Sequence, residues 1–289
     1  MALFQKNSGA EVGERNLPIR FSSSVPFQGS LPIKLISTDF DGTLHADHED
    51  PPVPHDLQEL IASLQVRGAK WVINTGRDLS SLMEGLGRAH LSIQPDWLVT
   101  VEREIFFREG PRFFPLQPWN GDCERAHREL FIAVEKDLPR LFQWVNGRFR
   151  ASVYSDIYSP FCLIAGTNAD ADDIEAHLKD YCESVPNLTV VRNDVYARFS
   201  HTAYSKGTAL AEITRQLGLT RECVFAAGDH FNDLPMLLNE HACWIVAPAN
   251  AIPQVQEAVW REGGYVSDRL WGHGVADGLE AAMKESGLL

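Results

Sequence analysis

The sequence predicts an α/β fold, an open doubly wound parallel sheet into which a second, α+β unit is inserted. The first observation behind this prediction is a set of short runs that are almost continuously apolar and end in polar or turn residues. The runs lie at residues 33–38, 71–74, 97–101, 223–227 and 242–246. Such runs are typical of parallel strands that are buried on both faces.

The second observation is the helical spacing of apolar residues between these runs. The segments with this spacing lie at residues 55–67, 78–90, 206–217 and 233–240. Strands that alternate with helices along the chain indicate a parallel sheet with helices packed on both of its faces.

The third observation is the distance between the run at 97–101 and Cys223, which is too long for one crossover connection. The expected elements inside it are a helix at 122–141, strands at 147–154 and 159–166, a helix at 170–184, and strands at 188–192 and 195–200. This order, helix–strand–strand repeated twice, predicts an independent unit with an antiparallel sheet. We therefore expect a core of residues 31–111 and 202–289, with an inserted domain of residues 112–201.

The composition limits the classes of partner. The net charge of −13 argues against nucleic acid or anionic membranes as partners. No apolar run approaches the roughly 18 to 20 residues that cross a bilayer, so we expect a soluble, cytoplasmic protein. Its five cysteines contain no Cys-x-x-Cys pair, which favours free thiols over a disulfide framework or a zinc site. Residues 1–30 are polar, lack the apolar segment of a secretory signal and are expected to form a loose extension, although a transit peptide stays open.

Polar clusters follow three of the expected strands. They are Asp39-Phe40-Asp41-Gly42-Thr43, Thr75-Gly76-Arg77 and Gly228-Asp229-His230-Phe231-Asn232-Asp233. Ligands of an open parallel sheet bind at the carboxyl ends of its strands, so these clusters converge if the strands are neighbours. Carboxylates, hydroxyl donors and exposed backbone amides together suit a hard divalent cation with a phosphate beside it.

The run Asp39-Phe40-Asp41-Gly42-Thr43-Leu44 resembles the first signature of the haloacid dehalogenase superfamily of phosphatases. Thr75 resembles its second motif and Lys206, which opens an expected helix, its third. Gly228-Asp229-x-x-Asn232-Asp233-x-x-Met236 resembles the fourth motif in the form of the Cof-type branch and its sugar-phosphatase relatives. The inserted unit falls between the second and third motifs, where that branch carries a large α/β cap. The resemblance covers about residues 32 to 285 and implies a Rossmann-like core, an inserted cap and a magnesium-dependent phosphatase.

The resemblance also implies distinct roles for the two carboxylates of the first motif. Asp39 would attack phosphorus and form an aspartyl-phosphate, while the Asp41 side chain would protonate the leaving alkoxide and later deprotonate water. The implied cofactor is Mg²⁺, held by Asp39, Asp229 and the main-chain carbonyl of Asp41. In an extended strand the two aspartates would share a face, and Gly42 would let the chain turn away.

The phosphate group has its own implied set of residues. Thr75 and Gly76 would donate from a hydroxyl and from the backbone, Asn232 from its amide, and Lys206 would supply positive charge at a helix N-terminus. Asp233 would support the site by holding Lys206 or a metal-bound water. Each of these residues alone has a structural explanation, such as a helix cap or a surface lysine. Their joint occurrence in the order of the motifs favours the catalytic interpretation.

Four other polar features are less decisive. Arg77 could contact the phosphate, or equally form a salt bridge with the following helix. The acidic and histidine-containing run 45–50 is interpreted as a solvated loop rather than a metal cluster. The segments 154–158 and 192–194 are turns between expected strands of the inserted unit, and could either contact a substrate or face solvent.

The favoured function is hydrolysis of a small phosphorylated metabolite, most simply a sugar phosphate. A phosphomutase uses the same aspartyl-phosphate, but mutases of this superfamily usually carry a smaller helical cap ahead of the second motif. Here only 31 residues separate Thr43 from Thr75, which disfavours that alternative. A phosphate-ligand binding protein without turnover is a third alternative, disfavoured because no key carboxylate is missing. The sequence does not distinguish a monomer from a homodimer.

Overall fold

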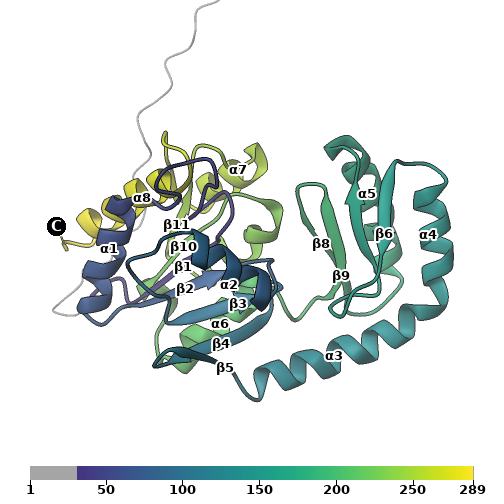
Figure 1. Ribbon diagram of the computed structural model, residues 1–289, viewed down its shortest axis with the longest axis horizontal. Coiled ribbons are helices and arrows are strands. Elements are labelled where there is room, and N and C mark those ends of the chain that lie inside the picture. The colour runs from purple at the N-terminus through teal and green to yellow at the C-terminus, as the bar shows by residue number, and fades with distance from the viewer. Residues whose placement is uncertain (1–30, 289) are drawn as a thin grey trace, which may run out of the picture.

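The computed structural model describes residues 31–288; the expected N-terminal extension, residues 1–30, lies outside the described residues. Two layered units lie side by side, each built on its own sheet (Figure 1). The larger unit contains the first and last elements of the described chain, and the smaller one is formed by the middle of the sequence.

The larger sheet has eight strands within residues 31–288, in the order β12-β11-β10-β1-β2-β3-β4-β5. Their bounds are β1 Leu35–Thr38, β2 Lys70–Asn74, β3 Trp97–Thr100, β4 Glu104–Glu109, β5 Arg112–Pro115, β10 Val224–Ala227, β11 Trp244–Ala247 and β12 Tyr265–Val266. All neighbouring pairs from β12 to β3 are parallel, and β4 and β5 extend the sheet as an antiparallel hairpin. The predicted doubly wound parallel core is therefore confirmed.

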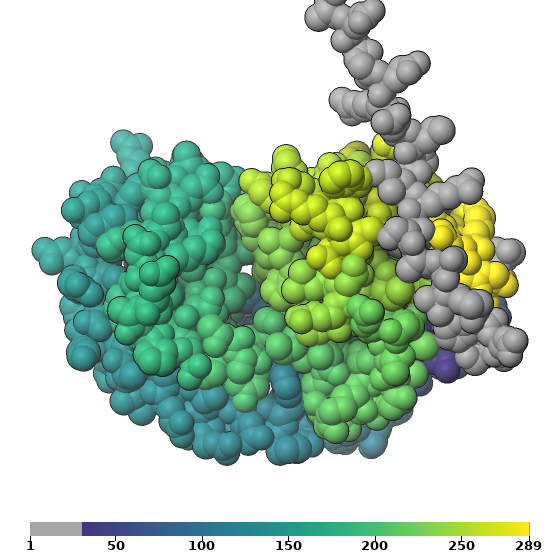
Figure 2. All heavy atoms as spheres, turned by 180° about the vertical axis from the view of Figure 1, so that it is seen from behind, coloured from purple at the N-terminus to yellow at the C-terminus, as the bar shows by residue number. Residues whose placement is uncertain are grey.

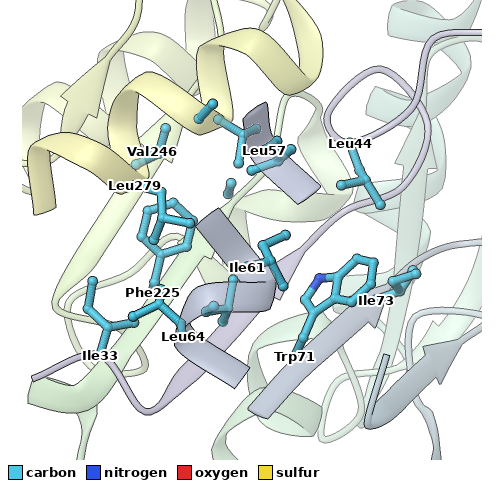
Figure 3. Close-up of a cluster of buried hydrophobic side chains, with 14 of the residues drawn as sticks. Ile33, Leu44, Leu57, Ile61, Leu64, Trp71, Ile73, Phe225, Val246 and Leu279 are labelled. Atoms are coloured by element: carbon cyan, nitrogen blue, oxygen red, sulfur yellow. The ribbon is translucent and has the colours of Figure 1, made fainter. Parts of the chain in front are cut away.

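Helices cover both faces of this sheet because successive strand residues point to opposite sides. On β2, Trp71 and Ile73 face helices α1 and α8, whereas Val72 faces α6 and α7. Figure 3 shows the first of these two cores, where Phe225 of β10 and Leu279 of α8 meet the side chains of α1. The bounds are α1 His55–Val66, α2 Leu79–Arg88, α6 Lys206–Gln216, α7 Pro253–Arg261 and α8 Trp271–Glu285, with short 3-10 helices at Arg221–Cys223 (η2) and Phe231–Met236 (η3). Each fully buried large apolar side chain contributes about 1.5–3 kcal/mol, so the two cores hold the strand ends in fixed positions.

The smaller unit is an antiparallel sheet in the order β6-β7-β9-β8, with helices on one face. Its elements are α3 Trp119–Val134, the 3-10 helix η1 Glu135–Asp137, α4 Leu138–Asn146, β6 Ala151–Tyr154, β7 Cys162–Ala165, α5 Asn168–Glu183, β8 Leu188–Asn193 and β9 Tyr196–His201. Helices α4 and α5 pack on the side of the sheet away from the larger unit (Figure 1). The opposite face of the sheet is therefore turned toward the larger unit.

Three expectations about elements differ from the structure. The helix expected at 122–141 is interrupted, because a 3-10 turn precedes α4 and Pro139 opens that new helix. The segment 112–115, expected in the inserted unit, is strand β5 and pairs with β4 in the larger sheet. The helix expected at 233–240 is wrong: the segment forms the 3-10 helix η3, with Pro235 inside it, and ends at Met236.

None of the five cysteines, all of which lie within residues 31–288, forms a disulfide. Within residues 31–288 there is no helix with the length and apolar character needed to span a bilayer.

Candidate active site

The three polar clusters meet at one edge of the larger sheet. Strand β1 is paired in parallel with β10 on one side and β2 on the other, and Thr38 at its end is level with Ala227 and Ile73. The loops that follow these strands therefore leave the sheet at the same edge. The backbone N–H of Asp39 donates to the carbonyl of Ala227 at 2.9 Å, which fixes the start of the loop after β1 against the end of β10.

A fully buried lysine lies at the centre of the site. The Lys206 Nζ donates to Asp39 Oδ1 at 2.7 Å and to Asp233 Oδ1 at 2.6 Å. Lys206 is the first residue of α6, which is capped by the side chain of Ser205. Although burial opposes the charge, the two carboxylates raise the pKa of Lys206, so the ammonium stays charged.

Both carboxylate oxygens of Asp233 accept hydrogen bonds from this framework. Its second oxygen, Oδ2, accepts the backbone N–H groups of Asp229 and His230 at 2.8 and 2.9 Å. Gly228 comes so close that a Cβ atom added there would lie 2.4 Å from the Cβ of Asp233. Only glycine fits this position, and the packing holds the Asp229 loop beside Lys206.

Asp39 and Asp229 have oxygens to spare. Asp229 Oδ1 accepts the hydroxyl of Thr43 at 2.6 Å, and Asp39 Oδ1 accepts from Lys206. The Oδ2 atoms of both aspartates have no hydrogen-bond partner within residues 31–288. Burial and the charge of Asp233 raise the pKa of Asp229 to about 7, and burial also raises the pKa of Asp39, against the attraction of Lys206.

These carboxylates fit a small divalent cation. One oxygen from each of Asp39, Asp229 and Asp233 lies within 4.8 Å of the other two. Carboxylate oxygens without hydrogen-bond donors favour a hard cation as their partner, because hard cations prefer oxygen ligands. Gly42, at φ +77°, lies against the carboxylate of Asp229, since a Cβ added to Gly42 would be 2.6 Å from Asp229 Oδ2. The site can therefore hold a divalent metal ion.

Asp41 is held by Arg77 in a bidentate salt bridge. The Nε and Nη2 atoms of Arg77 each lie 2.6 Å from one carboxylate oxygen of Asp41. These hydrogen bonds raise the pKa of Arg77, and the guanidinium also lies over the ring of Phe40, 5.3 Å from its centroid. Of the two roles considered for Arg77, the structure shows a salt bridge, but its partner is Asp41 rather than a residue of the following helix.

The expected phosphate-binding residues lie around the second loop. Thr75 is buried, and its hydroxyl oxygen accepts the backbone N–H of Arg77 at 3.2 Å. Asn232 donates from Nδ2 to Glu102 Oε1 at 3.2 Å, while its own Oδ1 is buried without a partner among the described residues. Gly76 lies between these groups, since a Cβ added to it would be 3.1 Å from Glu102 Oε1.

Glu102 is a site residue that sequence reasoning missed. It follows β3 in the chain, is only 6% exposed, and has a positive φ of 68°. Because β3 is the parallel neighbour of β2, the rule that selected the other loops would have selected this one too.

A cavity of about 480 Å³ lies between the two units. Its wall on the larger unit includes Asp39, Asp41, Thr75 and Gly76, and the opposite wall is formed by strands of the smaller sheet. Lys206 and Asn232 line a second cavity of about 460 Å³, which also touches Glu102. Figure 2 shows the seam between the two units from the side opposite to Figure 1.

A larger cavity, about 820 Å³, lies beside α3 and includes Arg103 and His127. None of the predicted catalytic, phosphate-binding or metal-binding residues lines it, whereas Ser155, Ile157 and Tyr158 of the segment 154–158 do. The cluster of predicted catalytic residues therefore lies at the cavity between the units and not at this larger one.

The interpretation of 45–50 as a solvated loop is wrong for its first residue. His45 is 3% exposed, and its ring stacks on Phe40 with 4.7 Å between centroids. Asp47 and His48 are exposed. Burial lowers the pKa of His45, which keeps its ring neutral in this apolar contact.

The comparisons with known proteins point to one family. Residues 150–276 match the family model of the haloacid dehalogenase-like hydrolases, and residues 32–154 match that of the sucrose-6F-phosphate phosphohydrolases. The 5-amino-6-(5-phospho-D-ribitylamino)uracil phosphatase of Bacillus subtilis is 26% identical over 261 residues, which cover 86% of this chain and 94% of that protein. A phosphoglycolate phosphatase of Methanothrix thermoacetophila is 32% identical over 203 residues, which cover 68% of this chain and 85% of the relative. The X-ray structure of the sucrose-phosphatase from Synechocystis, in complex with sucrose and phosphate, has a TM-score of 0.64 at 18% identity and covers 87% of this chain and 98% of its own.

The fold and the acidic site thus define an α/β enzyme with a Rossmann-like core and an inserted cap. The chain belongs to the haloacid dehalogenase-like hydrolase family, and it is a phosphatase. We refer to the larger unit as the core and to the smaller one as the cap.

Proposed function

We propose that this enzyme is a Mg²⁺-dependent phosphatase that hydrolyses a small phosphorylated metabolite, with a sugar phosphate as the favoured class, through an aspartyl-phosphate on Asp39. The observation that carries the proposal is the arrangement of Lys206 between Asp39 and Asp233, with the Asp41–Arg77 pair lining the same cavity as Asp39. The buried Lys206 ammonium thereby orients the Asp39 carboxylate. Arg77 holds the Asp41 carboxylate, two residues further along the chain, through two hydrogen bonds.

Asp39 is the proposed nucleophile. Lys206 fixes one of its oxygens, so the carboxylate is oriented before a substrate arrives. A new bond forms between the carboxylate and phosphorus, and the bond from phosphorus to the leaving oxygen breaks. Asp41, protonated once it releases Arg77 from one of its oxygens, gives its proton to the leaving oxygen, and the alcohol leaves.

Water then attacks the phosphorus of the aspartyl-phosphate. Asp41, now a carboxylate, accepts a proton from the water, and Asp39 departs as a carboxylate while inorganic phosphate is released. Arg77 holds the Asp41 carboxylate through both oxygens, so Arg77 sets the position from which Asp41 acts as acid and base.

The proposed metal site consists of the carboxylates of Asp39 and Asp229 and the main-chain carbonyl of Asp41. A magnesium ion bound there would neutralise the negative charge that the phosphate shares with these carboxylates. Asp233 serves a different purpose in this proposal, because its oxygens already hold Lys206 and the backbone of the Asp229 loop.

The phosphate oxygens would be held by four groups around the second loop. They are the Thr75 hydroxyl, the backbone N–H of Gly76, the Asn232 amide and the Lys206 ammonium. The Asn232 amide uses one hydrogen on Glu102, which leaves its second hydrogen for a phosphate oxygen. Fixed donors of this kind stabilise developing negative charge without rearranging during the reaction.

The names of two relatives support a hydroxyl-bearing substrate, whereas the Methanothrix relative is named for phosphoglycolate. The Synechocystis sucrose-phosphatase was solved with sucrose and phosphate, and the Bacillus subtilis relative is named for a phosphorylated ribityl compound. The polar cavity between core and cap is of the kind that such a substrate requires.

The test is phosphate release from a panel of phosphorylated metabolites, with Mg²⁺ or with EDTA, by wild type, Asp39→Asn and a matched control. We expect Asp39→Asn to lower turnover by at least about 10³-fold, because it removes the nucleophile but keeps the shape of the side chain. Asp180→Asn makes the same change on the exposed surface of the cap and should act as wild type does. Equal turnover by Asp39→Asn, or turnover that EDTA does not affect, would contradict the mechanism. An isomerised sugar phosphate without free phosphate would indicate a mutase, and binding without turnover would indicate a binding protein.

A further inference from the structure

The cap sheet presents a row of side chains to the cavity that the mechanism above does not use. The register of the strands places Tyr154 opposite Cys162, Cys162 opposite Arg198, and Arg198 opposite Val191. All four line the cavity that contains Asp39 and Asp41. Successive residues of a strand point to opposite faces of the sheet. The residues next to these four along their strands therefore pack into the core of the cap beneath α4 and α5. The row is therefore the floor of the cap as seen from the catalytic loops.

Arg198, on β9, is the cation of this row. Its Nη2 donates to the carbonyl oxygen of Gly76 at 3.1 Å, across the boundary between cap and core. It forms no ion pair with any residue in the range 31–288. A guanidinium has five N–H donors, so most of the donors of Arg198 are left for a ligand. Arg77, in the same cavity, instead uses its donors on Asp41 and the carbonyl of Ser81.

Glu102 borders the same glycine from the core. Its Oε1 accepts from Asn232, and its Oε2 is buried without a partner among the described residues. A buried acceptor without a donor is destabilising, and so is a left-handed backbone at a residue other than glycine. When both occur at one residue beside an active site, the position is a candidate for a functional contact. What Glu102 lacks is a hydrogen-bond donor.

Two tyrosines add aromatic surface to the cap wall. Tyr154 and Tyr196 are 42% and 54% exposed, and both line the cavity. Exposed aromatic rings in a pocket suit a ligand with carbon surface as well as polar groups.

The charges around the cavity disfavour a leaving group that is itself an anion. Asp41 is neutralised by Arg77, and Asp39 is paired with Lys206. Glu102 and Asp156 then remain in the wall against the single guanidinium of Arg198. A leaving group with a carboxylate or a second phosphate would meet net repulsion, whereas one with neutral hydroxyls could donate to Glu102 and accept from Arg198.

We propose that Arg198 and Glu102 are the specificity residues of this enzyme, and that they select a phosphate ester whose alcohol is a neutral polyol, with the tyrosines covering its carbon chain or ring. This inference rests on the proposed function, since it concerns the leaving group of the same reaction. The segment 154–158, left open between substrate contact and solvent exposure, would contribute Tyr154 to recognition.

The experiment compares three kinds of ester with the magnesium-supplied enzyme. The first is a panel of pentose, hexose and alditol monophosphates, the second is phosphoglycolate, whose leaving group carries a carboxylate, and the third is p-nitrophenyl phosphate, which has no hydroxyls. We expect wild type to have a kcat/KM at least about tenfold higher for its best polyol phosphate than for phosphoglycolate. Arg198→Gln should lower kcat/KM for the polyol phosphate about 30-fold, mainly through KM, but for p-nitrophenyl phosphate only about threefold.

Two further variants complete the design. Glu102→Gln should produce the same selective loss, because the glutamine oxygen can still accept from Asn232 while the second acceptor, which is offered to the substrate, is replaced by a donor. Arg140→Gln removes the same charge from an arginine of α4 that is 72% exposed, so it should match wild type on all three esters.

The outcomes separate the two levels of the proposal. Equal losses on the polyol phosphate and on p-nitrophenyl phosphate would show that Arg198 acts only through the Gly76 loop, and would overturn the inference. A wild-type preference for phosphoglycolate would overturn it as well. If wild type released no phosphate from any of the three kinds of ester, the proposed function itself would fail, and this result is distinct from either of the other two.

Discussion

Replacement of Lys206 by methionine should destabilise the protein strongly and in a pH-dependent way. The ammonium is completely buried and pairs with Asp39 at 2.7 Å and with Asp233 at 2.6 Å. Methionine has a similar length and no charge, so the substitution leaves two carboxylates close together without their cation. Breaking a buried ion pair by removing one partner costs about 3–5 kcal/mol, and we expect a loss of this size at pH 8.

The sign of the pH dependence follows from the carboxylates that remain. Burial already raises the pKa of Asp39 above its ordinary value although Lys206 opposes this shift, so removing Lys206 raises it further. A folded state with a raised carboxyl pKa binds a proton more readily than the unfolded chain does. Its stability therefore rises as the pH falls toward the carboxyl pKa of the unfolded chain, which is about 4. The deficit of the variant relative to wild type should therefore shrink by at least about 1 kcal/mol between pH 8 and pH 5.5.

Urea denaturation of wild type and variant in EDTA measures this difference without a contribution from bound metal. Lys284→Met is the matched control, because Lys284 is 63% exposed and its partner Glu280 is itself 46% exposed. An exposed pair of this kind contributes about 0–1 kcal/mol, so the control should lie close to wild type at every pH. A Lys206→Met deficit below about 1 kcal/mol, or one that is the same at pH 8 and pH 5.5, would refute the reasoning.

Two other predictions follow from the geometry. Arg77→Lys should lower kcat/KM for p-nitrophenyl phosphate about 100-fold, since lysine cannot hold both oxygens of Asp41. The control in the same kinetic assay is Arg215→Lys, which alters a comparable bidentate pair with Glu212 on the surface of α6 and should act as wild type does. Burial in the cap lowers the pKa of His127 to about 3, so below about pH 6.5 the unfolded chain takes up a proton that the folded chain does not. Between pH 7 and pH 5 the free energy of unfolding of wild type should fall by up to about 2 kcal/mol because of His127. Urea denaturation at both pH values should show a smaller fall in His127→Gln. Equal falls would show that His127 does not titrate as the structure indicates.

The sequence predicted the parts of the fold whose signal is local. Strands β1, β2 and β10 are short apolar runs buried on both faces, so the sequence predicted their existence and their place in a parallel sheet, but not which of them are neighbours. The hairpin of β4 and β5 was missed because β5 is the edge strand of the sheet and is mostly exposed, so it lacks a continuous apolar run. Edge strands are defined by which neighbour they pair with, and that information is not local.

The same distinction applies to the site. Asp39, Asp41, Asp229 and Lys206 were predicted from motifs, and the structure brings them together around the end of β1. Glu102 was not predicted: the strand-end rule reaches its loop, but the contact itself depends on the direction of the Glu102 side chain toward Asn232. Pairing and rotamer together decide such a contact, and neither can be obtained from a single residue type.

The motif glycines explain why the catalytic residues are readable from sequence whereas the substrate-facing ones are not. Gly42 and Gly228 approach the carboxylates of Asp229 and Asp233 so closely that an added Cβ would overlap them. The chemistry therefore constrains neighbouring positions as well as the reactive ones, and the constraint appears as a recognisable run of residues. Arg198 has no such neighbours, because its place over the site depends on the register of three cap strands. A change of substrate requires only a new side chain on that exposed row, with no change to the core, so the cap can vary in specificity while the motifs keep their form.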